Sequence, residues 1–334
     1  MTEMLSTPLL APVELALVDR WQRGFPVVAR PYAEIAAREG LSEAEILALL
    51  RRLDAAGVLS RVGATVRPNT AGASMLAAMR VPPARLEEVA AIVNREPTVN
   101  HNYERENEIN LWFVVTGADR TALAGALARI RSASGLDVLE LPLERSYFID
   151  LGFGLTGHTN GERVAPATFC PGASWSLAPA DQRLLAGLAD GLALASEPYE
   201  ELARVAGLEQ GEALERIARL VSTGIVTRLG LIVRHRALGF KANAMAVWDV
   251  ADEAVDAVGH ELAAQSFVTL CYRRPRRMPD WPYNLFCMVH GRERDAVRQQ
   301  VEQLTRRIGA AQRGHAVLFS RRCFRQHGAR LNAR

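Results

Sequence analysis

The sequence has few of the features that mark several large classes of protein. Its four cysteines lie far apart without a CxxC pair, so neither a disulfide framework nor a zinc site is expected. Acidic and basic residues nearly balance at a formal charge of +3, which by itself indicates no nucleic-acid partner. No stretch reaches the ~18 uninterrupted apolar residues of a membrane span, and the first residues lack the pattern of a signal peptide. We therefore expect a cytoplasmic protein without a membrane partner.

The sequence does contain a repeat. The segment PYAEIAAREGLSEAEILALLRRLDAAGVLSRVG starts at Pro31, and PYEELARVAGLEQGEALERIARLVSTGIVTRLG starts at Pro198, 167 positions later. The same offset, without a gap, pairs Tyr32 with Tyr199, Glu34 with Glu201, Gly40 with Gly207, Leu41 with Leu208, Gly57 with Gly224, Arg61 with Arg228, Gly63 with Gly230, Arg67 with Arg234 and Gly72 with Gly239. This run indicates duplication of one module. Residues 153–180, rich in Gly, Pro, Ser and Thr, are predicted to link the copies.

The first part of each copy is predicted to be helical. A short helix near Tyr32–Glu39 is followed by Ser42, which is placed to cap a second helix, with Glu45 completing a capping box. Gly57 ends that helix, and VLSRVGATV follows as a β-wing. The pattern is that of a winged helix-turn-helix. The two domains of this kind are predicted at residues 1–72 and 181–239.

The second part of each copy alternates predicted strands and helices. In the first copy, strands are expected at residues 73–81, 98–105, 109–117 and 136–148, and helices at 83–95 and 119–133. The order βαββαβ predicts ferredoxin-like domains at residues 73–152 and 240–334. The expected fold is α+β and internally duplicated. A winged helix-turn-helix followed by such a domain resembles the Lrp/AsnC family of regulators.

The second helix of the helix-turn-helix is acidic at the end where a DNA-reading helix offers basic or amide side chains. Glu43 and Glu45 begin it in the first copy, and Glu209, Glu212 and Glu215 lie there in the second. These carboxylates would face phosphates, and a duplex carries one charge per ~1.7 Å. We therefore expect no DNA partner, and a helical domain kept for packing or dimer contacts.

The second copy carries an insertion rich in arginine. From Tyr to Asn there are 7 positions in the first copy (Tyr103 to Asn110) but 12 in the second (Tyr272 to Asn284). The longer loop contains Arg273, Arg274, Arg276 and Arg277, with Met278, Trp281 and Tyr283. Arginine binds carboxylates and phosphates bidentately, so the loop is a candidate clamp for a flat polyanion such as a tetrapyrrole or single-stranded nucleic acid. A solvated basic hairpin tip is the alternative, and composition does not separate the two.

Two histidines distinguish the copies. His101 lies on a predicted strand, and its counterpart in the second copy is Leu270. His235 precedes the first αβ strand of the second copy, and its counterpart is Pro68. A lone histidine is more often structural than catalytic. Because each copy holds one that the other lacks, the copies are expected to have taken different roles around one site.

The segments HNYERE and NLWF in the first copy resemble the NirD-type half of the siroheme decarboxylases. RLGLIVRHRALGFKANAM and YRRPRRMPDWPYNLFCMVHG resemble the NirL-type half. The resemblance covers nearly the whole chain and is to the fused NirDL form of this family, whose subunits are called AhbA and AhbB in alternative heme biosynthesis. It implies a carbon–carbon lyase that removes the C12 and C18 acetate carboxyl groups of siroheme, giving 12,18-didecarboxysiroheme and CO₂ for heme d1 biosynthesis.

The resemblance also implies roles for single residues. His101 and His235 match the histidines near the tetrapyrrole and become the acid/base candidates, since histidine titrates near neutral pH and can protonate the macrocycle. Substrate-binding roles fall to Arg273, Arg274, Tyr272, Tyr103, Arg105, Arg276, Arg277 and Arg234. Whether a histidine instead ligates the siroheme iron is left open. The iron enters with the substrate, so no separate cofactor and no protein metal site are expected.

Because neither copy holds all of these features, one competent site per pair of halves is expected. The partners are then siroheme and its decarboxylated product, while a homodimer and association with related NirG/NirH-type proteins are left open. Two alternatives remain at this point. One is an Lrp/AsnC-type transcriptional regulator that binds heme or an amino acid, and the other is a non-catalytic tetrapyrrole-binding protein.

Overall fold

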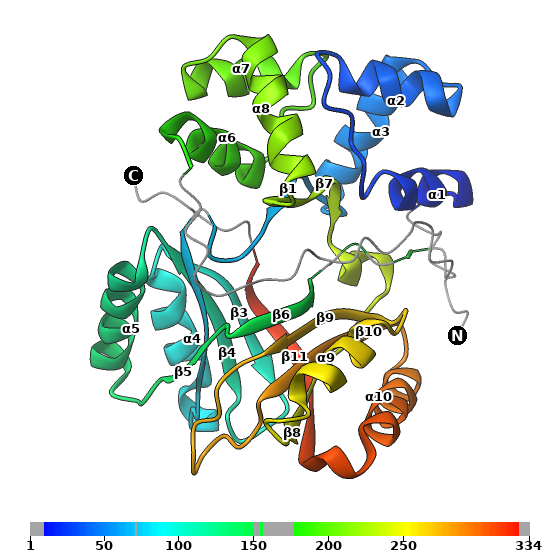
Figure 1. The fold of residues 1–334 in the computed structure, drawn as a ribbon. Coiled ribbons are helices and arrows are strands. Elements are labelled where there is room, and N and C mark those ends of the chain that lie inside the picture. The colour runs from blue at the N-terminus through cyan, green and yellow to red at the C-terminus, as the bar shows by residue number, and fades with distance from the viewer. Residues whose placement is uncertain (1–9, 71, 150–151, 153, 156–176, 327–334) are drawn as a thin grey trace, which may run out of the picture.

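The computed structural model describes residues 10–70, 72–149, 152, 154–155 and 177–326. It contains a helical unit and, beneath it, a unit built on one large β-sheet (Figure 1). Most of the predicted linker, residues 153–180, lies outside the described residues, and a helix already begins within it at Pro179. Among the described helices, none is long and apolar enough to cross a membrane.

The helical unit combines the first parts of both copies. Its helices are α1 (Pro12–Arg20), α2 (Pro31–Glu39), α3 (Glu43–Ala55), α6 (Pro179–Asp190), α7 (Pro198–Ala206) and α8 (Gln210–Ser222). The predicted capping box is present, because the Glu45 amide donates to the Ser42 hydroxyl at 3.3 Å and the Ser42 amide donates to the Glu45 carboxylate at 2.7 Å. Gly57 follows α3 with a φ of 69°, as a helix-ending glycine does.

The predicted wings do not form within each copy. Instead β1 (Leu59–Val66) of the first copy pairs antiparallel with β7 (Val226–Val233) of the second, with Gly63 opposite Gly230. This corrects the expectation of a separate wing in each copy, since each copy supplies only one strand. A Cβ at Gly230 would lie 2.2 Å from the Gln22 carbonyl oxygen, and one at Gly63 would lie 2.4 Å from that of Leu188. The repeated glycines therefore allow the backbone of this ribbon to approach the chain packed against it.

The two copies share one core in the helical unit. The repeated tyrosines each reach the other copy, because the Tyr32 hydroxyl donates to the Ala193 carbonyl at 3.0 Å and the Tyr199 hydroxyl donates to the Pro26 carbonyl at 3.0 Å. Apolar residues from all six helices and from both ribbon strands form a single buried cluster. The two predicted winged helix-turn-helix domains have thus fused into one unit.

The sheet unit holds the αβ parts of both copies. Its strands are β2 (Ala73–Met79), β3 (Val99–Arg105), β4 (Leu111–Gly117), β5 (Leu139–Pro142), β6 (Arg145–Ile149), β8 (Ala242–Val250), β9 (Val268–Arg273), β10 (Leu285–Gly291) and β11 (Gln312–Gln326). Its helices are α4 (Leu86–Arg95), α5 (Arg120–Ser134), α9 (Val255–Ala263) and α10 (Arg294–Ile308). The strand order is β5-β2-β4-β3-β11-β8-β10-β9-β6. Within each copy this is the ferredoxin-like order, which confirms the predicted βαββαβ units.

The strand predicted at residues 136–148 is in fact two strands that lie at opposite edges of the sheet. β5 pairs with β2 of its own copy, whereas β6 pairs with β9 of the other copy. Only Leu143 and Glu144 separate them, and so short a link spans no more than about 11 Å. The sheet must therefore fold over on itself, so that its two halves face each other as packed sheets do.

This folding produces four layers. The helices α4 and α5 cover the outer face of the first half-sheet, and α9 and α10 cover that of the second (Figure 1). Alternate residues point inward, so Phe113 contacts the helices while its neighbour Trp112 packs between the half-sheets. The inner cluster also includes Met245, Trp281 and Phe286. Toward the helical unit, the side chains of the described residues leave a cavity between the half-sheets.

Candidate functional site

A cavity of about 550 Å³ lies between the inner faces of the two half-sheets, beneath the β1–β7 ribbon. Both copies line it, through the inner strands of the sheet, through β7, and through the short 3-10 helix η2 (His235–Leu238) that follows β7. Its described lining includes five arginines, three histidines and no carboxylate. These basic residues are Arg105, Arg228, Arg234, Arg236, Arg325, His101, His235 and His290. A cavity of this size and charge suits a small ligand that carries several negative charges.

Alternate residues of β3 bring three predicted site residues to the cavity wall. His101, Tyr103 and Arg105 share one face of the strand, and the rings of His101 and Tyr103 lie 6.2 Å apart. The Arg105 guanidinium lies 5.8 Å from the Tyr103 ring and donates to the Leu318 carbonyl at 3.2 Å. Burial raises the pKa of the Tyr103 hydroxyl. The tyrosine is therefore a neutral hydrogen-bonding group at neutral pH.

The first copy contributes Arg105, a deeply buried cation, to the cavity lining. Its side chain is only 8% exposed, and burial lowers its pKa. Within the described part of the chain, no carboxylate forms an ion pair with it. A buried cation without a counter-ion is costly, so its position favours an anionic ligand that supplies the missing charge.

The surroundings of His235 and His290 within the protein favour the neutral imidazole. Burial lowers the pKa of His235 to about 3, helped by the nearby His290 and by Arg228. Burial also lowers the pKa of His290 to about 4, with Arg105 adding to the effect. Desolvation and the surrounding positive charge disfavour the imidazolium of His235, so its pKa lies well below the usual range of histidine.

Two further predicted residues join this wall. Tyr272 is buried against Phe286, with ring centroids 5.8 Å apart, and lines the cavity from β9. Arg234 lies at the exposed margin and donates to the Gly57 carbonyl at 3.0 Å. The structure thus brings together His101, His235, Tyr103, Arg105, Tyr272 and Arg234.

Sequence reasoning missed four basic residues of the cavity. His290 occupies the position of Thr116 in the first copy, which is the same kind of asymmetry that singled out His101. Arg228 is 7% exposed and matches an arginine in the first copy, so comparison of the copies gave no signal. Arg236 and Arg325 also lie on the lining; Arg236 stands next to His235 within the segment RLGLIVRHRALGFKANAM but was not singled out, and no motif marked Arg325.

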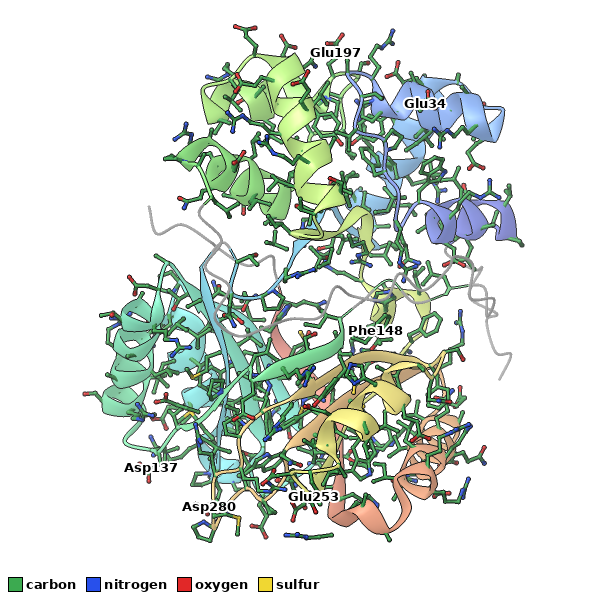
Figure 2. All side chains as sticks on the ribbon, in the orientation of Figure 1. Glu34, Asp137, Phe148, Glu197, Glu253 and Asp280 are labelled. Carbon is green, nitrogen blue, oxygen red and sulfur yellow. The ribbon has the colours of Figure 1, made fainter. Side chains whose placement is uncertain are left out.

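The arginine-rich loop is not part of the cavity. Arg273 pairs with Glu144 at 3.0 Å, and Arg276 pairs with Asp249 at 2.6 Å and with Asp252 at 2.7 Å. Asp280 marks the tip of this loop, and Glu34 and Glu197 mark the helical unit (Figure 2). The tip lies at the end of the sheet unit that is remote from the helical unit. These two arginines therefore have protein partners and are not placed to hold a ligand of the cavity.

The other two loop arginines bind the edge of the first half-sheet. Arg274 donates to the carbonyl of Leu141, and Arg277 donates to that of Glu140 at 2.8 Å. Both carbonyls belong to the edge strand β5, whose outer side pairs with no strand of the described residues. The loop thus joins the two half-sheets and protects an edge. This corrects the interpretation of the four arginines as a clamp for the ligand.

The loop aromatics also have a packing role. Trp281 is 1% exposed, and its ring lies 4.9 Å from that of Trp112 in the other copy and 4.9 Å from that of Tyr283. The side chain fills the space between the half-sheets below the cavity. It is therefore a core residue rather than a stacking surface for a ligand.

Known proteins share both parts of this architecture. A family model described as the siroheme decarboxylase NirDL-like HTH domain matches residues 14–59 and 181–226, and one described as the AsnC-like ligand binding domain matches 71–147 and 237–325. The siroheme decarboxylase NirDL subunit of Paracoccus denitrificans is 47% identical over 96% of this chain and 97% of its own length. The chain belongs to the siroheme decarboxylase NirDL family. The resemblance drawn from the sequence is confirmed.

Solved structures of the NirDL family agree with the fold. A crystal structure of the siroheme decarboxylase NirDL superposes with a TM-score of 0.67, at 25% identity, over 95% of this chain and 94% of that one. A second crystal structure, of that enzyme in co-complex with an iron-uroporphyrin III analogue, gives a TM-score of 0.66 at the same identity and coverage. The expected α+β fold, with duplicated winged helix-turn-helix and Lrp/AsnC-like domains, is confirmed.

Proposed function

We propose that this chain is a siroheme decarboxylase. The reaction removes the C12 and C18 acetate carboxyl groups of siroheme, gives 12,18-didecarboxysiroheme and CO₂, and serves heme d1 biosynthesis. It is a carbon–carbon lyase reaction. The observation that carries the proposal is the cavity between the half-sheets, whose described lining holds five arginines and no carboxylate in a chain of the NirDL family. The related enzyme crystallised with an iron-uroporphyrin III analogue supports a tetrapyrrole as the occupant.

The charges of the cavity fit the side chains of such a substrate. Siroheme carries acetate and propionate groups around a flat ring, and arginine holds carboxylates through paired hydrogen bonds. Arg105 and Arg228 approach from the sheet and from the ribbon respectively, so carboxylates on different edges of the ring can be held at once. Arginines should hold the carboxylates that remain, because binding the departing one more tightly than the transition state would slow the reaction.

The histidines supply the protons. The protein by itself keeps His235 neutral, because burial lowers its pKa to about 3. Carboxylates of the bound substrate raise that pKa by adding nearby negative charge, so the proton donor forms only when substrate is present. His235 or His101 then protonates the macrocycle, which becomes an electron sink.

The C–C bond to the carboxylate breaks, its electron pair enters the ring system, and CO₂ leaves. A proton added to the exocyclic methylene carbon then gives the methyl group, and the macrocycle returns its added proton to a histidine, so that one proton is consumed for each CO₂ released. His101 comes from the first copy and His235 from the second, so one site draws on both. We accordingly propose one competent site per chain. The iron arrives as part of siroheme, and no separate cofactor is proposed. Absence of a DNA partner stays a prediction.

Anaerobic incubation with siroheme, followed by mass spectrometry of the extracted tetrapyrrole, tests the proposal. The wild-type chain should remove two CO₂, whereas His101→Ala and His235→Ala should each slow the loss by about 10²-fold or more with folding intact. His315→Ala is a matched control, since His315 is an exposed residue of β11 outside the cavity lining. Binding without any mass change would support a non-catalytic carrier instead. Full turnover by both cavity variants would contradict the proton-transfer role.

A further inference from the structure

His290 is a third histidine of the cavity, and the proposed proton transfers do not use it. It lies at the end of β10, and its Nδ1 atom is 2.9 Å from the hydroxyl oxygen of Thr269 on the neighbouring strand β9. Alignment of the copies places Thr116 at the position of His290 and Asn100 at that of Thr269. This histidine–threonine pair therefore belongs to the second copy alone.

A β-bulge turns Thr269 toward His290. The pairing of β9 with β10 steps from Leu270 opposite Met288 to Val268 opposite Val289, which leaves Thr269 as the extra residue. Val268 points to the helix-covered core, whereas Leu270 faces the cavity. Bulges often redirect a side chain next to a functional site, and here the redirected hydroxyl meets the imidazole.

The Thr269 hydroxyl determines which nitrogen of His290 carries the proton. The hydroxyl is buried, and its oxygen lies 3.1 Å from the carbonyl oxygen of Met288, which can only accept. The single hydroxyl proton is therefore donated to that carbonyl. The proton between Oγ1 and Nδ1 must then belong to the imidazole. Neutral His290 is thus the Nδ1–H tautomer, with its lone pair on Nε2.

We propose that Thr269 and His290 form a positioning pair that presents the Nε2 lone pair of His290 to the iron of the bound tetrapyrrole as an axial ligand. This inference rests on the substrate class of the proposed function. Histidines that bind metals generally donate the other ring N–H to a second group, which fixes the tautomer and the direction of the ring. Coordination also requires the neutral imidazole. Proton donation from Nε2 would require either the opposite tautomer, which the hydrogen bonds of Thr269 oppose, or the imidazolium, whose pKa burial and Arg105 lower.

The proposal separates two tasks within one cavity. His101 and His235 would transfer protons at the edge of the macrocycle, while His290 would bind the iron at its centre. A ligand bond at the iron fixes the height and tilt of the ring, and arginines such as Arg105 then select its rotation through the carboxylates. His290 would therefore act on the reaction through the position of the substrate.

Two ligands that differ only in the iron test this proposal. Iron(III) uroporphyrin III and metal-free uroporphyrin III carry the same carboxylates and differ only at the centre of the ring. His290→Ala should weaken binding of the iron form by roughly tenfold or more, shift its visible absorption, and leave the affinity for the metal-free form nearly unchanged. Equal weakening of both probes, or an unchanged absorption spectrum of the iron complex, would overturn the proposal. Normal binding of the metal-free probe also reports that the variant is folded.

Variants of Thr269 test the positioning. Thr269→Val keeps the shape but lacks the hydroxyl, and it should lose roughly tenfold in affinity for the iron probe alone, whereas Thr269→Ser should restore it. Thr116→Val is the matched control in the first copy, where the hydroxyl donates to the Thr98 carbonyl at 3.3 Å, and it should bind like the wild type. Valine and serine variants that bind alike would overturn the role of Thr269. These binding measurements need no turnover, so they still test the proposed iron ligand even if no decarboxylation is found.

Discussion

Binding of iron(III) uroporphyrin III at pH 7 should place about half a proton on His235, as a pKa near 7 requires. The pKa of this histidine is about 3 in the empty cavity, and a useful proton donor needs a value near 7. A rise of about four units corresponds to about 5 kcal/mol of favourable interaction with the imidazolium, at about 1.36 kcal/mol per unit. One carboxylate 4 Å away contributes about 4 kcal/mol at an effective dielectric constant of about 20. One or two substrate carboxylates near His235 are therefore sufficient.

Calorimetric titration at pH 7 in buffers of different ionisation enthalpy measures this uptake. The slope of the apparent binding enthalpy against the buffer ionisation enthalpy gives the number of protons taken up. The wild-type chain should take up about half a proton, and His235→Gln should take up about none because glutamine does not titrate. His315→Gln, on the exposed part of β11, is the matched control and should behave like the wild type.

Two results would contradict the protonation of His235 on ligand binding. Wild-type binding without proton uptake would mean that the substrate carboxylates do not raise the pKa of His235. An unchanged uptake in His235→Gln would assign the proton to another group. Either result would remove His235 as the donor that forms when substrate binds.

Three further predictions concern stability and binding. His235 and His290 have folded pKa values of about 3 and about 4, below the unfolded value of about 6.5, so the unfolded chain binds more protons between these values. The free energy of unfolding from urea titrations of the empty protein should therefore be highest above about pH 6.5 and fall toward pH 4, less steeply in His235→Gln; equal slopes would contradict this. Arg105→Met should weaken uroporphyrin binding about tenfold without lowering the melting temperature of the ligand-free protein, because it removes a buried cation to which the described residues offer no carboxylate partner. A lower melting temperature with unchanged affinity would show a structural role instead. Arg276→Gln should do the reverse, because loss of its pairs with two aspartates costs about 1.5–3 kcal/mol far from the cavity, and weaker binding would contradict this.

The sequence was sufficient to predict the elements of the fold, because their signals are local. The capping box at Ser42, the glycine that ends α3 and the βαββαβ order all follow from short patterns. It was not sufficient to predict which strands pair. Alternating apolar residues identify β1, β6 and β7 as strands, but nothing in that pattern says that their partners belong to the other copy.

Prediction of the site from the sequence succeeded where the copies differ and failed where composition was the guide. His101 was found because Leu270 replaces it in the second copy, and His290 could have been found in the same way against Thr116. The interpretation of the arginine-rich loop as a ligand clamp was wrong because composition shows the charged residues but not their partners. Its ion pairs with Asp249 and Asp252, and its hydrogen bonds to the edge of β5, depend on the folded sheet.

Native mass spectrometry of the chain with siroheme, followed over time without oxygen, tests the central claim most directly. One tetrapyrrole should bind per chain, because the histidines and arginines of both copies line one cavity, and it should be converted by loss of two CO₂. Two tetrapyrroles bound per chain would contradict a single site built from two diverged copies. One bound tetrapyrrole whose mass never changes would contradict the decarboxylase.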